Sequence, residues 1–307
     1  MPRYFGRRLL GIIPVLWGVA TLVFIIMRML PGDPAALMLS EAGGSAEAIA
    51  ELRAELGLDA PLLVQYGRYL LNLVQGDLGT SLFTQRPVIT TIAEQLPSTI
   101  ELAIASMLVA VSLGTALGVL AAVKHGTWVD TAATSLSVTG VSVPVFWSAL
   151  LLIWLFSLKL NWLPATGQGT AAHLALPALV LGFASAGAIA RLVRTSLIEA
   201  LSADYVGTAR AKGLPEGTIL VRHTLRNAFI PVVTVIGLQF GFLLGGTVVT
   251  ETIFARQGIG RLLVDAILWK DFPVVQGVVL LAAMVYLVVN LGVDVVYVLL
   301  DPRIHHD

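Results

Sequence analysis

The sequence predicts an all-α polytopic membrane protein with six transmembrane helices and a long, partly helical extracytoplasmic loop between the first two. Hydrophobic residues make up 57% of the 307 residues. Charged residues make up only 12%, whereas ordinary globular proteins carry roughly 25%. With a mean hydropathy of +0.87, a soluble chain of 32.6 kDa could not bury this much apolar surface, so lipid must cover it.

Six runs without Asp, Glu, Lys, Arg or His define the spans. They cover residues 9–27, 102–123, 131–158, 174–190, 228–250 and 272–293. A helix needs about 20 apolar residues to cross a hydrocarbon layer of roughly 30 Å. The run 174–190 is the shortest, and we expect it to extend to His173 or Arg191 at an interface.

The first run follows Arg3, Arg7 and Arg8, but it is too long for a secretory signal and no cleavage site follows it. We therefore expect an uncleaved membrane anchor. Lys and Arg concentrate in the N-terminal tail and in residues 191–227, and segments rich in these residues stay in the cytoplasm. Both termini are accordingly expected to be cytoplasmic.

The loop of residues 31–97 is expected on the outer side, and it contains two helical patterns. Ser45 is a candidate N-cap and Gly57 a candidate stop for the first helix. The second helix is predicted to run from Pro61 to Gly76. The loop is thus expected to fold on the membrane surface.

The second span is expected to begin at a capping box. Ser98 is followed three residues later by Glu101, and each side chain can accept a hydrogen bond from a backbone N–H of the first turn. The helix is therefore predicted to start at Ser98.

The spans contain no ionisable residue near their middle, although ion- and proton-coupled transporters usually need one there. Glycines recur four apart in the fifth span, a spacing that lets helix backbones approach closely. Six uncharged positions are therefore assigned to helix packing or to the lining of a passage: Ser142, Pro144, Gly237, Gln239, Gly241 and Gly245.

Signatures of catalysis are absent from the sequence. It contains no G-x-x-x-x-G-K-[ST] for ATP phosphates, no H-E-x-x-H and no G-x-S-x-G. It has no Cys, which excludes disulfides and cysteine metal sites, and its net charge of zero gives no reason to expect nucleic acid as a partner. We expect no enzymatic activity, metal or cofactor in this chain.

One charged segment, residues 202–227, interrupts the apolar chain: "SADYVGTARAKGLPEGTILVRHTLRN". Ser202 is a candidate cap for a helix of residues 203–212, and Gly213 stands where a left-handed stop is expected. Pro215 then begins a second helix that leads into the fifth span. The segment is either an ordinary inside loop that contacts lipid headgroups or a helix that docks on a cytoplasmic partner.

This segment resembles the cytoplasmic coupling loop of bacterial binding-protein-dependent ABC-transporter permeases, whose pattern is E-A-A-x3-G-x9-I-x-L-P. Three positions match: Ala209 is the second alanine, Gly213 the glycine and Leu225 the leucine. The other four differ, with Gly207 for the glutamate, Thr208 for the first alanine, His223 for the isoleucine and Arg226 for the proline. The segments "DYVGTARAKGL" and "RHTLRNAFIP" are instead similar to the sequences of the dipeptide, oligopeptide and nickel branch of that family.

Further stretches extend this resemblance over the whole chain, in the order found in that branch. They are "RRLLGIIPVLWGVATLVFIIMRMLPGDPA", "LGLDAPLLVQYGRYLLNLVQGDLGTS", "ETIFARQGIGRLLVDAILWKDFPVVQG" and the terminal "DPRI". Together with six spans, these stretches are specific to the branch.

The resemblance implies a type I ABC importer permease of the bacterial inner membrane, which forms half of a pathway for di- or oligopeptides or glutathione-like peptides. The implied partners are a second homologous permease subunit, two ATP-binding cassette subunits that carry ATP and Mg, an extracytoplasmic substrate-binding protein and membrane lipid. The implied ATPase-coupling residues are Asp204, Tyr205, Thr208, Ala209, Arg210, Lys212, Gly213, Leu214, Arg222 and His223. Rotation at Gly213 is expected to carry the motion of the ATPases into spans four and five.

On this resemblance, residues 1–97 form the N-terminal anchor helix and extracytoplasmic loop. Residues 98–300 form a five-helix permease core with the coupling loop 191–227, and residues 301–307 form a cytoplasmic tail. Dipeptides are the first candidate substrate. The alternatives are a permease of the same family for nickel chelates, an ion-coupled secondary transporter, and a membrane scaffold without a transport role.

Overall fold

The computed structural model describes residues 2–29, 33–40 and 45–300, and the regular elements in these ranges are helices, apart from one isolated bridge between Thr80 and Pro87. The chain divides into two compact units. Unit 1 comprises residues 1–97 and 257–287, and unit 2 comprises residues 98–256 and 288–307. The expected tail, residues 301–307, lies outside the described residues.

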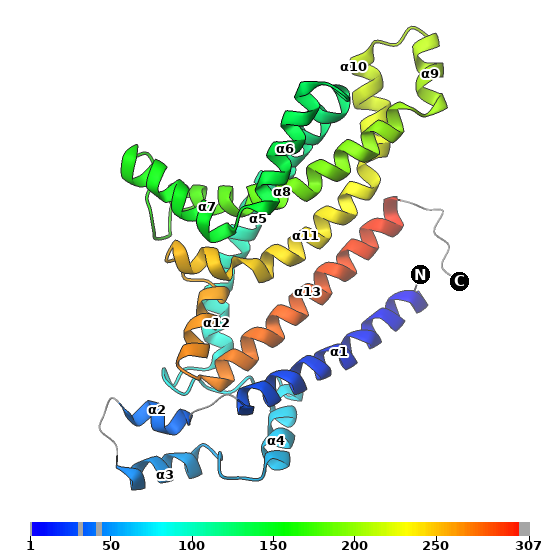
Figure 1. The fold of residues 1–307 in the computed structure, drawn as a ribbon. Helices are drawn as coiled ribbons and strands as arrows, with labels where there is room; N and C mark the ends of the chain where they lie inside the picture. The colour runs from blue at the N-terminus through cyan, green and yellow to red at the C-terminus, as the bar shows by residue number, and fades with distance from the viewer. Residues whose placement is uncertain (1, 30–32, 41–44, 301–307) are drawn as a thin grey trace. The chain divides into compact units, whose positions relative to one another are not determined.

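The helices follow one another along the chain as labelled in Figure 1. Unit 1 contains α1 (Pro2–Met29), α2 (Pro34–Ser40), α3 (Ala46–Glu55), α4 (Leu62–Val74), α12 (Ile259–Leu268) and the first parts of α5 (Val88–Val123) and α13 (Phe272–Leu300). Unit 2 contains the rest of α5 and α13, α6 (Trp128–Ser142), α7 (Val145–Leu152), α8 (Ala171–Leu201), α9 (Asp204–Ala211), α10 (Glu216–Thr218), α11 (Leu225–Ile253) and the π-helical segments η1 (Ile153–Lys159) and η2 (Ile219–Thr224).

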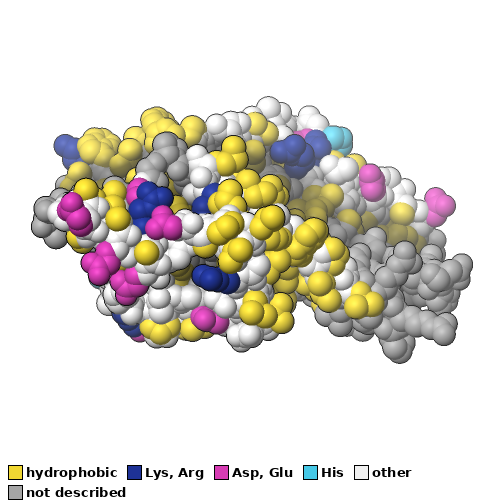
Figure 2. All heavy atoms as spheres, turned by 90° about the horizontal axis from the view of Figure 1, so that it is seen from below, with side chains coloured by type: hydrophobic (Ala, Val, Ile, Leu, Met, Phe, Trp, Pro, Cys, Tyr) yellow, Lys and Arg dark blue, Asp and Glu magenta, His cyan; other side chains and the backbone are white. Residues whose placement is uncertain are grey.

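Five helical stretches in the described residues are long and apolar enough to cross a membrane, and a sixth is counted if α6 and α7–η1 form one bent span. The five are Leu10–Met29, Val88–Val123, Ala171–Leu201, Glu216–Leu243 and Phe272–Gly292. Figure 2 shows hydrophobic side chains, in yellow, reaching the surface over much of the described face. The all-helical fold expected from the sequence is therefore confirmed, with five or six candidate membrane spans in the described residues.

The third expected span, residues 131–158, is not one straight helix. α6 ends at Ser142 and α7 begins at Val145. Between α6 and the continuous segment of α7 and η1, the helix axis bends by 104°. Pro144 causes the break, because proline has no N–H to donate and its ring disfavours the helical conformation of the residue before it. Val143 accordingly has extended backbone angles, φ −82° and ψ 126°.

The second span begins earlier than the capping box predicts. α5 starts at Val88 and continues through Pro97, so Ser98 lies inside the helix and the prediction of a helix start there is wrong. The added turns are held by packing, since Val88 and Ile92 are almost completely buried in the core of unit 1. Tertiary burial of these two side chains outweighs the local start signal.

The two helices predicted in the loop of residues 31–97 are confirmed. The Ser45 hydroxyl accepts a hydrogen bond from Ala48 N at 3.3 Å at the start of α3. Gly57 after α3 has φ +65° and Gly76 after α4 has φ +78°, the left-handed conformation that ends many helices. The short helix α2 was not expected.

The core of unit 1 forms where the first turns of α5 meet the first turns of α13. Val88 and Ile92 pack with Val274, Val275 and Val278 in one buried cluster. This contact anchors the loop side of unit 1 to a membrane span.

The core of unit 2 forms around α8, which packs against α5, α6 and α11 (Figure 1). Glycines make the closest approaches on both sides of these contacts: Gly114 and Gly118 on α5, Gly140 on α6, and Gly182 and Gly187 on α8. A Cβ added at any of them would lie 2.3–2.8 Å from an atom of the facing helix. Close packing by small residues thus exists, and it involves glycines that the sequence analysis did not single out.

Candidate functional site

The helix α9 ends in a Schellman motif around Gly213. Gly213 has φ +76°, a conformation that glycine adopts without a steric penalty. Gly213 N donates to Arg210 O at 2.9 Å, and Leu214 N donates to Ala209 O at 3.3 Å. The left-handed stop predicted from the sequence is confirmed, and it turns the chain from α9 to α10.

Ser202 does not cap α9. It has helical backbone angles at the end of α8, and its hydroxyl donates to Ile198 O at 2.6 Å. The N-cap of α9 is Ala203, which has no side chain able to accept a hydrogen bond from the helix. The prediction is wrong because α8 extends to Leu201, and Ser202 is the C-cap of α8 and not the N-cap of α9.

A small apolar core seats α9 on η2. Val206 and Ile219 are completely buried, and Ala209 is buried beside them. This three-residue cluster joins two segments that are separated in sequence by the Gly213 turn. The helix α9, the turn and η2 therefore share a small apolar core.

An ion pair spans the same turn. Arg210 Nε donates to Glu216 Oε1 at 2.7 Å, and Arg210 Nη2 donates to Glu216 Oε2 at 3.2 Å. The hydrogen bond that Arg210 donates to Glu216 raises the pKa of Arg210, which keeps the guanidinium charged. Both side chains are exposed, so the pair orients the turn more than it stabilises the fold.

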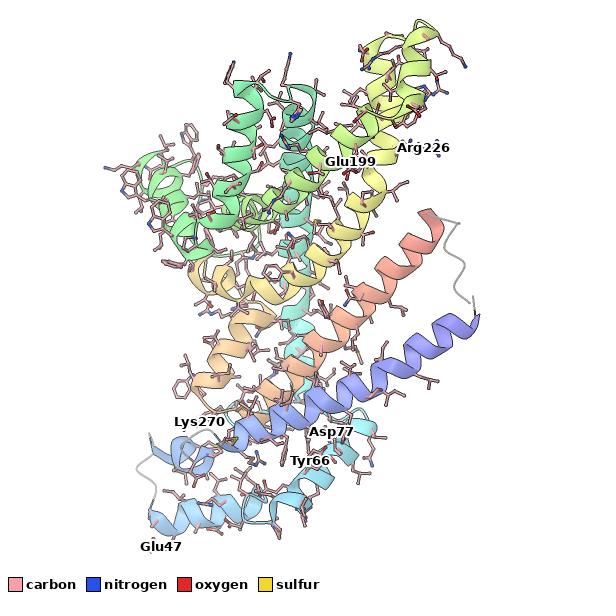
Figure 3. All side chains as sticks on the ribbon, turned by 45° about the vertical axis from the view of Figure 1, so that its right-hand side comes forward. Glu47, Tyr66, Asp77, Glu199, Arg226 and Lys270 are labelled. Carbon is pink, nitrogen blue, oxygen red and sulfur yellow. The ribbon has the colours of Figure 1, made fainter. Side chains whose placement is uncertain are left out.

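Most of the coupling residues named from the sequence are exposed at this end of unit 2: Asp204, Tyr205, Thr208, Arg210, Lys212, Gly213, Leu214 and Arg222. His223 is half-buried, and Ala209 is buried in the core with Val206. Figure 3 labels Glu199 of α8 and Arg226 of α11 at the same end of the unit. The structure brings these residues together, and their role in coupling stays a prediction.

The π-helical segment η2 was not predicted. Leu225 N donates to Leu220 O, five residues earlier, which is the backbone pattern of a π-helix, and the Thr224 hydroxyl donates to Ile219 O at 2.7 Å. π-Helical turns are rare and occur frequently at functional sites. The sequence offers no local signal for this one beyond the threonine itself.

The positions assigned to helix packing or a passage lie in different surroundings. Ser142 and Pro144 are exposed at the break between α6 and α7. On α11, Gln239 Nε2 is 3.5 Å from Ser185 O and Gly241 is buried, while Gly237 is half-buried. The surroundings of Gly245 lie outside what the structure describes. Their assignment remains a prediction.

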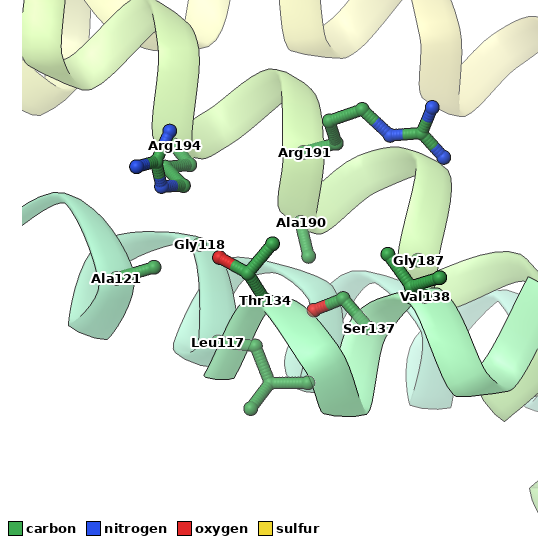
Figure 4. A pocket seen from close by; sticks show the side chains of 10 residues that line it. All are labelled: Leu117, Gly118, Ala121, Thr134, Ser137, Val138, Gly187, Ala190, Arg191 and Arg194. Carbon is green, nitrogen blue, oxygen red and sulfur yellow. The ribbon is translucent and has the colours of Figure 1, made fainter. Parts of the chain in front are cut away.

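A pocket of about 300 Å³ lies between α5, α6 and α8 (Figure 4). Its walls are mainly small and apolar: Leu117, Gly118, Ala121, Thr134, Ser137, Val138, Gly187, Ala190, Arg191 and Arg194. Figure 4 shows Arg191 and Arg194 pointing in different directions from α8. The pocket thus has an apolar floor and two arginines from one helix at its side.

Arg194 is held by Asp130, a residue that the sequence analysis missed. Arg194 Nε donates to Asp130 Oδ1 at 2.7 Å, and Arg194 Nη2 donates to Asp130 Oδ2 at 2.8 Å. Asp130 also accepts from Gly126 N at 3.0 Å, and His125 Nδ1 lies 3.1 Å from it. The pair ties α6 to α8 at a distance of 64 residues, which no short motif reveals.

A second polar cluster lies in unit 2 where α5 passes the end of α11. Glu251 Oε1 accepts from the Thr99 hydroxyl at 2.6 Å, and both residues are almost completely buried. Arg256 is 1% exposed, and its Nη2 donates to Glu101 Oε2 at 2.9 Å and to the Ser98 hydroxyl at 3.3 Å. The two residues expected to form a capping box therefore bind an arginine instead.

Comparisons with known proteins identify the family. The profile described as "Binding-protein-dependent transport system inner membrane component" matches residues 114–306, and its N-terminal counterpart matches residues 1–103. The glutathione transport system permease protein GsiC of Salmonella paratyphi A is 48% identical over 308 residues, and that of Escherichia coli K12 is 47% identical. In both comparisons the alignment covers 100% of each chain.

Solved structures share the fold at low sequence identity. An inward-facing structure of the methionine ABC transporter MetNI has a TM-score of 0.59 and 17% identity, and covers 69% of this chain and 97% of its own. An amino acid ABC transporter with histidines has a TM-score of 0.51 and 16% identity, and covers 70% of this chain and 95% of its own. The two profile matches and the full-length relatives show that the chain belongs to the family of inner-membrane permease subunits of binding-protein-dependent ABC importers, which are not themselves catalytic.

Proposed function

We propose that this permease subunit imports glutathione or peptides of similar size. The observation that carries the proposal is the 48% identity to a glutathione transport permease over the full length of both chains. Dipeptides, oligopeptides and nickel chelates are the other substrates of the resembling branch. The family match leaves no role for an ion-coupled secondary transporter, and it argues against a scaffold without transport.

The subunit works within a type I importer in this proposal. A second homologous permease chain completes the pathway, two ATP-binding cassette subunits supply ATP and Mg, and an extracytoplasmic binding protein delivers the substrate. Both termini and α9 face the cytoplasm, in agreement with the concentration of Lys and Arg in residues 191–227.

The docking element for the ATPases is the exposed face of α9 and the turn after it. Tyr205 is 39% exposed and Leu214 is 36% exposed, so both apolar side chains are available to a partner. The apolar core of Val206, Ala209 and Ile219 makes α9 and η2 move as one body. A push on α9 thus reaches α11 directly, with less bending at Gly213 than the sequence suggested.

Substitution of Gly213 tests the coupling role. The left-handed conformation costs an L-residue roughly 1–2 kcal/mol, and a β-branched side chain tolerates it worst. In a reconstituted complex, Gly213→Val is expected to reduce the stimulation of ATPase activity by loaded binding protein. The matched control is Gly217→Val, because Gly217 has no atom within 4 Å of its added Cβ and no positive φ. Full coupled uptake in Gly213→Val would exclude this role.

Uptake into proteoliposomes tests the substrate. Proteoliposomes that contain the complete importer are supplied with ATP on the side of the ATPase subunits and with the binding protein on the other side. Uptake of radiolabelled glutathione into the vesicles is measured with and without competing dipeptides or a nickel–histidine chelate. Glutathione or peptide uptake that depends on ATP supports the proposal. Uptake of the nickel chelate alone would replace it with the nickel alternative.

A further inference from the structure

The helix α4 has three chemically different sides. Gln65 and Tyr66 face a neighbouring helix, and Arg68 and Asn72 are exposed polar residues on a second side. The third side is apolar and exposed. At 3.6 residues per turn, these sides lie roughly 120° apart around the helix axis.

The apolar side is a continuous stripe of large side chains. Leu63 is 84% exposed, Leu71 is 59% exposed and Val74 is 87% exposed. These three residues fall within an arc of about 80° on a helical wheel. No residue of α4 is buried among the described residues, so the helix leaves this stripe unpaired within unit 1.

The contacts of the first side fix the depth of α4 beside α1. The Tyr66 hydroxyl is 2.6 Å from Thr21 Oγ1, and the Tyr66 ring packs on Phe24 with centroids 5.2 Å apart. Arg28 Nε and Nη2 donate to Gln65 Oε1 at 2.9 and 2.7 Å. Figure 3 labels Tyr66 where α4 lies against α1.

The partners of α4 on α1 belong to a membrane span. Leu10–Met29 is the first stretch long and apolar enough to cross a bilayer, and Thr21, Phe24 and Arg28 lie within its last three turns. At 1.5 Å per residue, Thr21 lies about 12 Å below the end of that stretch at Met29. The contacts of α4 therefore begin at Arg28, at the boundary between headgroups and hydrocarbon, and reach about 12 Å into the apolar stretch at Thr21.

We infer that α4 is an interfacial helix embedded in the bordering leaflet of the bilayer, and that lipid acyl chains cover the stripe of Leu63, Leu71 and Val74. Interfacial helices typically bury an apolar face about 5–10 Å into the headgroup and acyl boundary. Arg68 and Asn72, on the adjoining side, then face headgroups and water. This inference goes beyond the proposed function and does not depend on the substrate.

Continuity with the lipid-facing surface of α1 favours lipid over a protein partner. Leu22 is 60% exposed, Ile26 is 52% exposed and Met29 is 77% exposed on the part of α1 that α4 accompanies. Exposed apolar side chains on a membrane span are of the kind that contacts hydrocarbon. The stripe on α4 adds exposed apolar side chains beside this part of α1, and the tyrosines that contact α1, Tyr66 and Tyr69, are residues typical of the membrane interface.

The absence of Cys allows a direct test in the complete importer. Single cysteines are introduced by Leu63→Cys, Leu71→Cys and Val74→Cys, with Arg68→Cys and Asn72→Cys as matched controls on the same helix. Each is given a nitroxide label in liposomes, and its collisions with oxygen, which concentrates in lipid, and with water-soluble nickel ethylenediaminediacetate are measured. The ratio of the two collision rates is expected to be several-fold higher at the three stripe positions than at the two controls.

Two results would overturn the inference. Stripe labels that meet the nickel reagent as often as the controls would show that water covers α4. Stripe labels that are shielded from both reagents would show that protein covers it, and repeating the measurement without the binding protein would tell whether that protein or the second permease is responsible. The labelled positions are exposed, so the substitutions are expected to leave folding intact. Retention of the complex on size-exclusion chromatography checks this for each variant.

Discussion

Replacing Gly118 by alanine would place a methyl group against the backbone of α8. The added Cβ would lie 2.6 Å from Ala190 O and 2.7 Å from Val193 Cβ. Carbon atoms in contact normally lie about 3.5–4.0 Å apart, so α5 and α8 must separate by about 0.8 Å at this point. Overpacking of this kind typically costs about 1–3 kcal/mol, and it opens a gap that weakens the neighbouring contacts.

The assay is thermal unfolding of the purified complex, followed by loss of the size-exclusion peak after heating. At roughly 2–4 °C per kcal/mol for units of roughly 150–250 residues, a range that includes unit 2, Gly118→Ala is expected to lower the midpoint by roughly 2–12 °C. The control is Gly67→Ala on α4, away from the proposed docking face, where no atom lies within 4 Å of the added Cβ. Alanine there favours the helix, so the midpoint should not fall. A Gly118→Ala complex as stable as the wild type would refute the assigned contact between α5 and α8.

Three further outcomes follow from the structure. Asp130→Asn should lower the thermal midpoint, and adding Arg194→Ala should cause little further loss, because both changes remove the same ion pair; an additive loss in the double variant would contradict this pairing. Pro144→Ala should restore an N–H at the break and straighten α6 towards α7, which a widened distance between spin labels on the two helices would report; an unchanged distance would assign the break to another cause. In the proposed orientation, a membrane-impermeant maleimide should label Glu51→Cys in intact spheroplasts and Thr208→Cys only after permeabilisation, and the reverse pattern would invert the topology.

Local signals in the sequence predicted the elements whose geometry is set by a few neighbouring residues. Gly57, Gly76 and Gly213 were expected as helix stops, and each has a positive φ. Glycine adopts this conformation without a steric penalty, so a glycine at the end of a helical pattern is a local signal for such a stop. The Ser45 cap succeeded for the same reason, because its partner lies three residues away.

Predictions failed where a distant part of the chain competes with the local pattern. Ser98 looked like a helix start, but burial of Val88 and Ile92 extends α5 beyond it. Ser202 looked like the cap of α9, but the last turn of α8 uses its hydroxyl. The break at Pro144 was not predicted, although a proline is a local signal that disfavours the helical conformation of the residue before it.

The candidate site was only partly readable from the sequence. The exposed face of α9 followed from charge and turn residues, which are local. The core that seats α9 on η2 joins Val206 to Ile219 across a turn, and the pair of Asp130 and Arg194 joins two helices 64 residues apart. Such contacts depend on tertiary packing, so no spacing rule predicts them.

The glycines at the surface of α8 affect how the helix responds to load. Where backbone touches backbone, no side-chain rotamers can rearrange to absorb a displacement. α8 contains 31 residues and is about 46 Å long at 1.5 Å per residue, and α9 follows directly after its last turn. Movement imposed at Leu201 therefore shifts the helix as a stiff rod, and α5 and α6 must slide along it or travel with it.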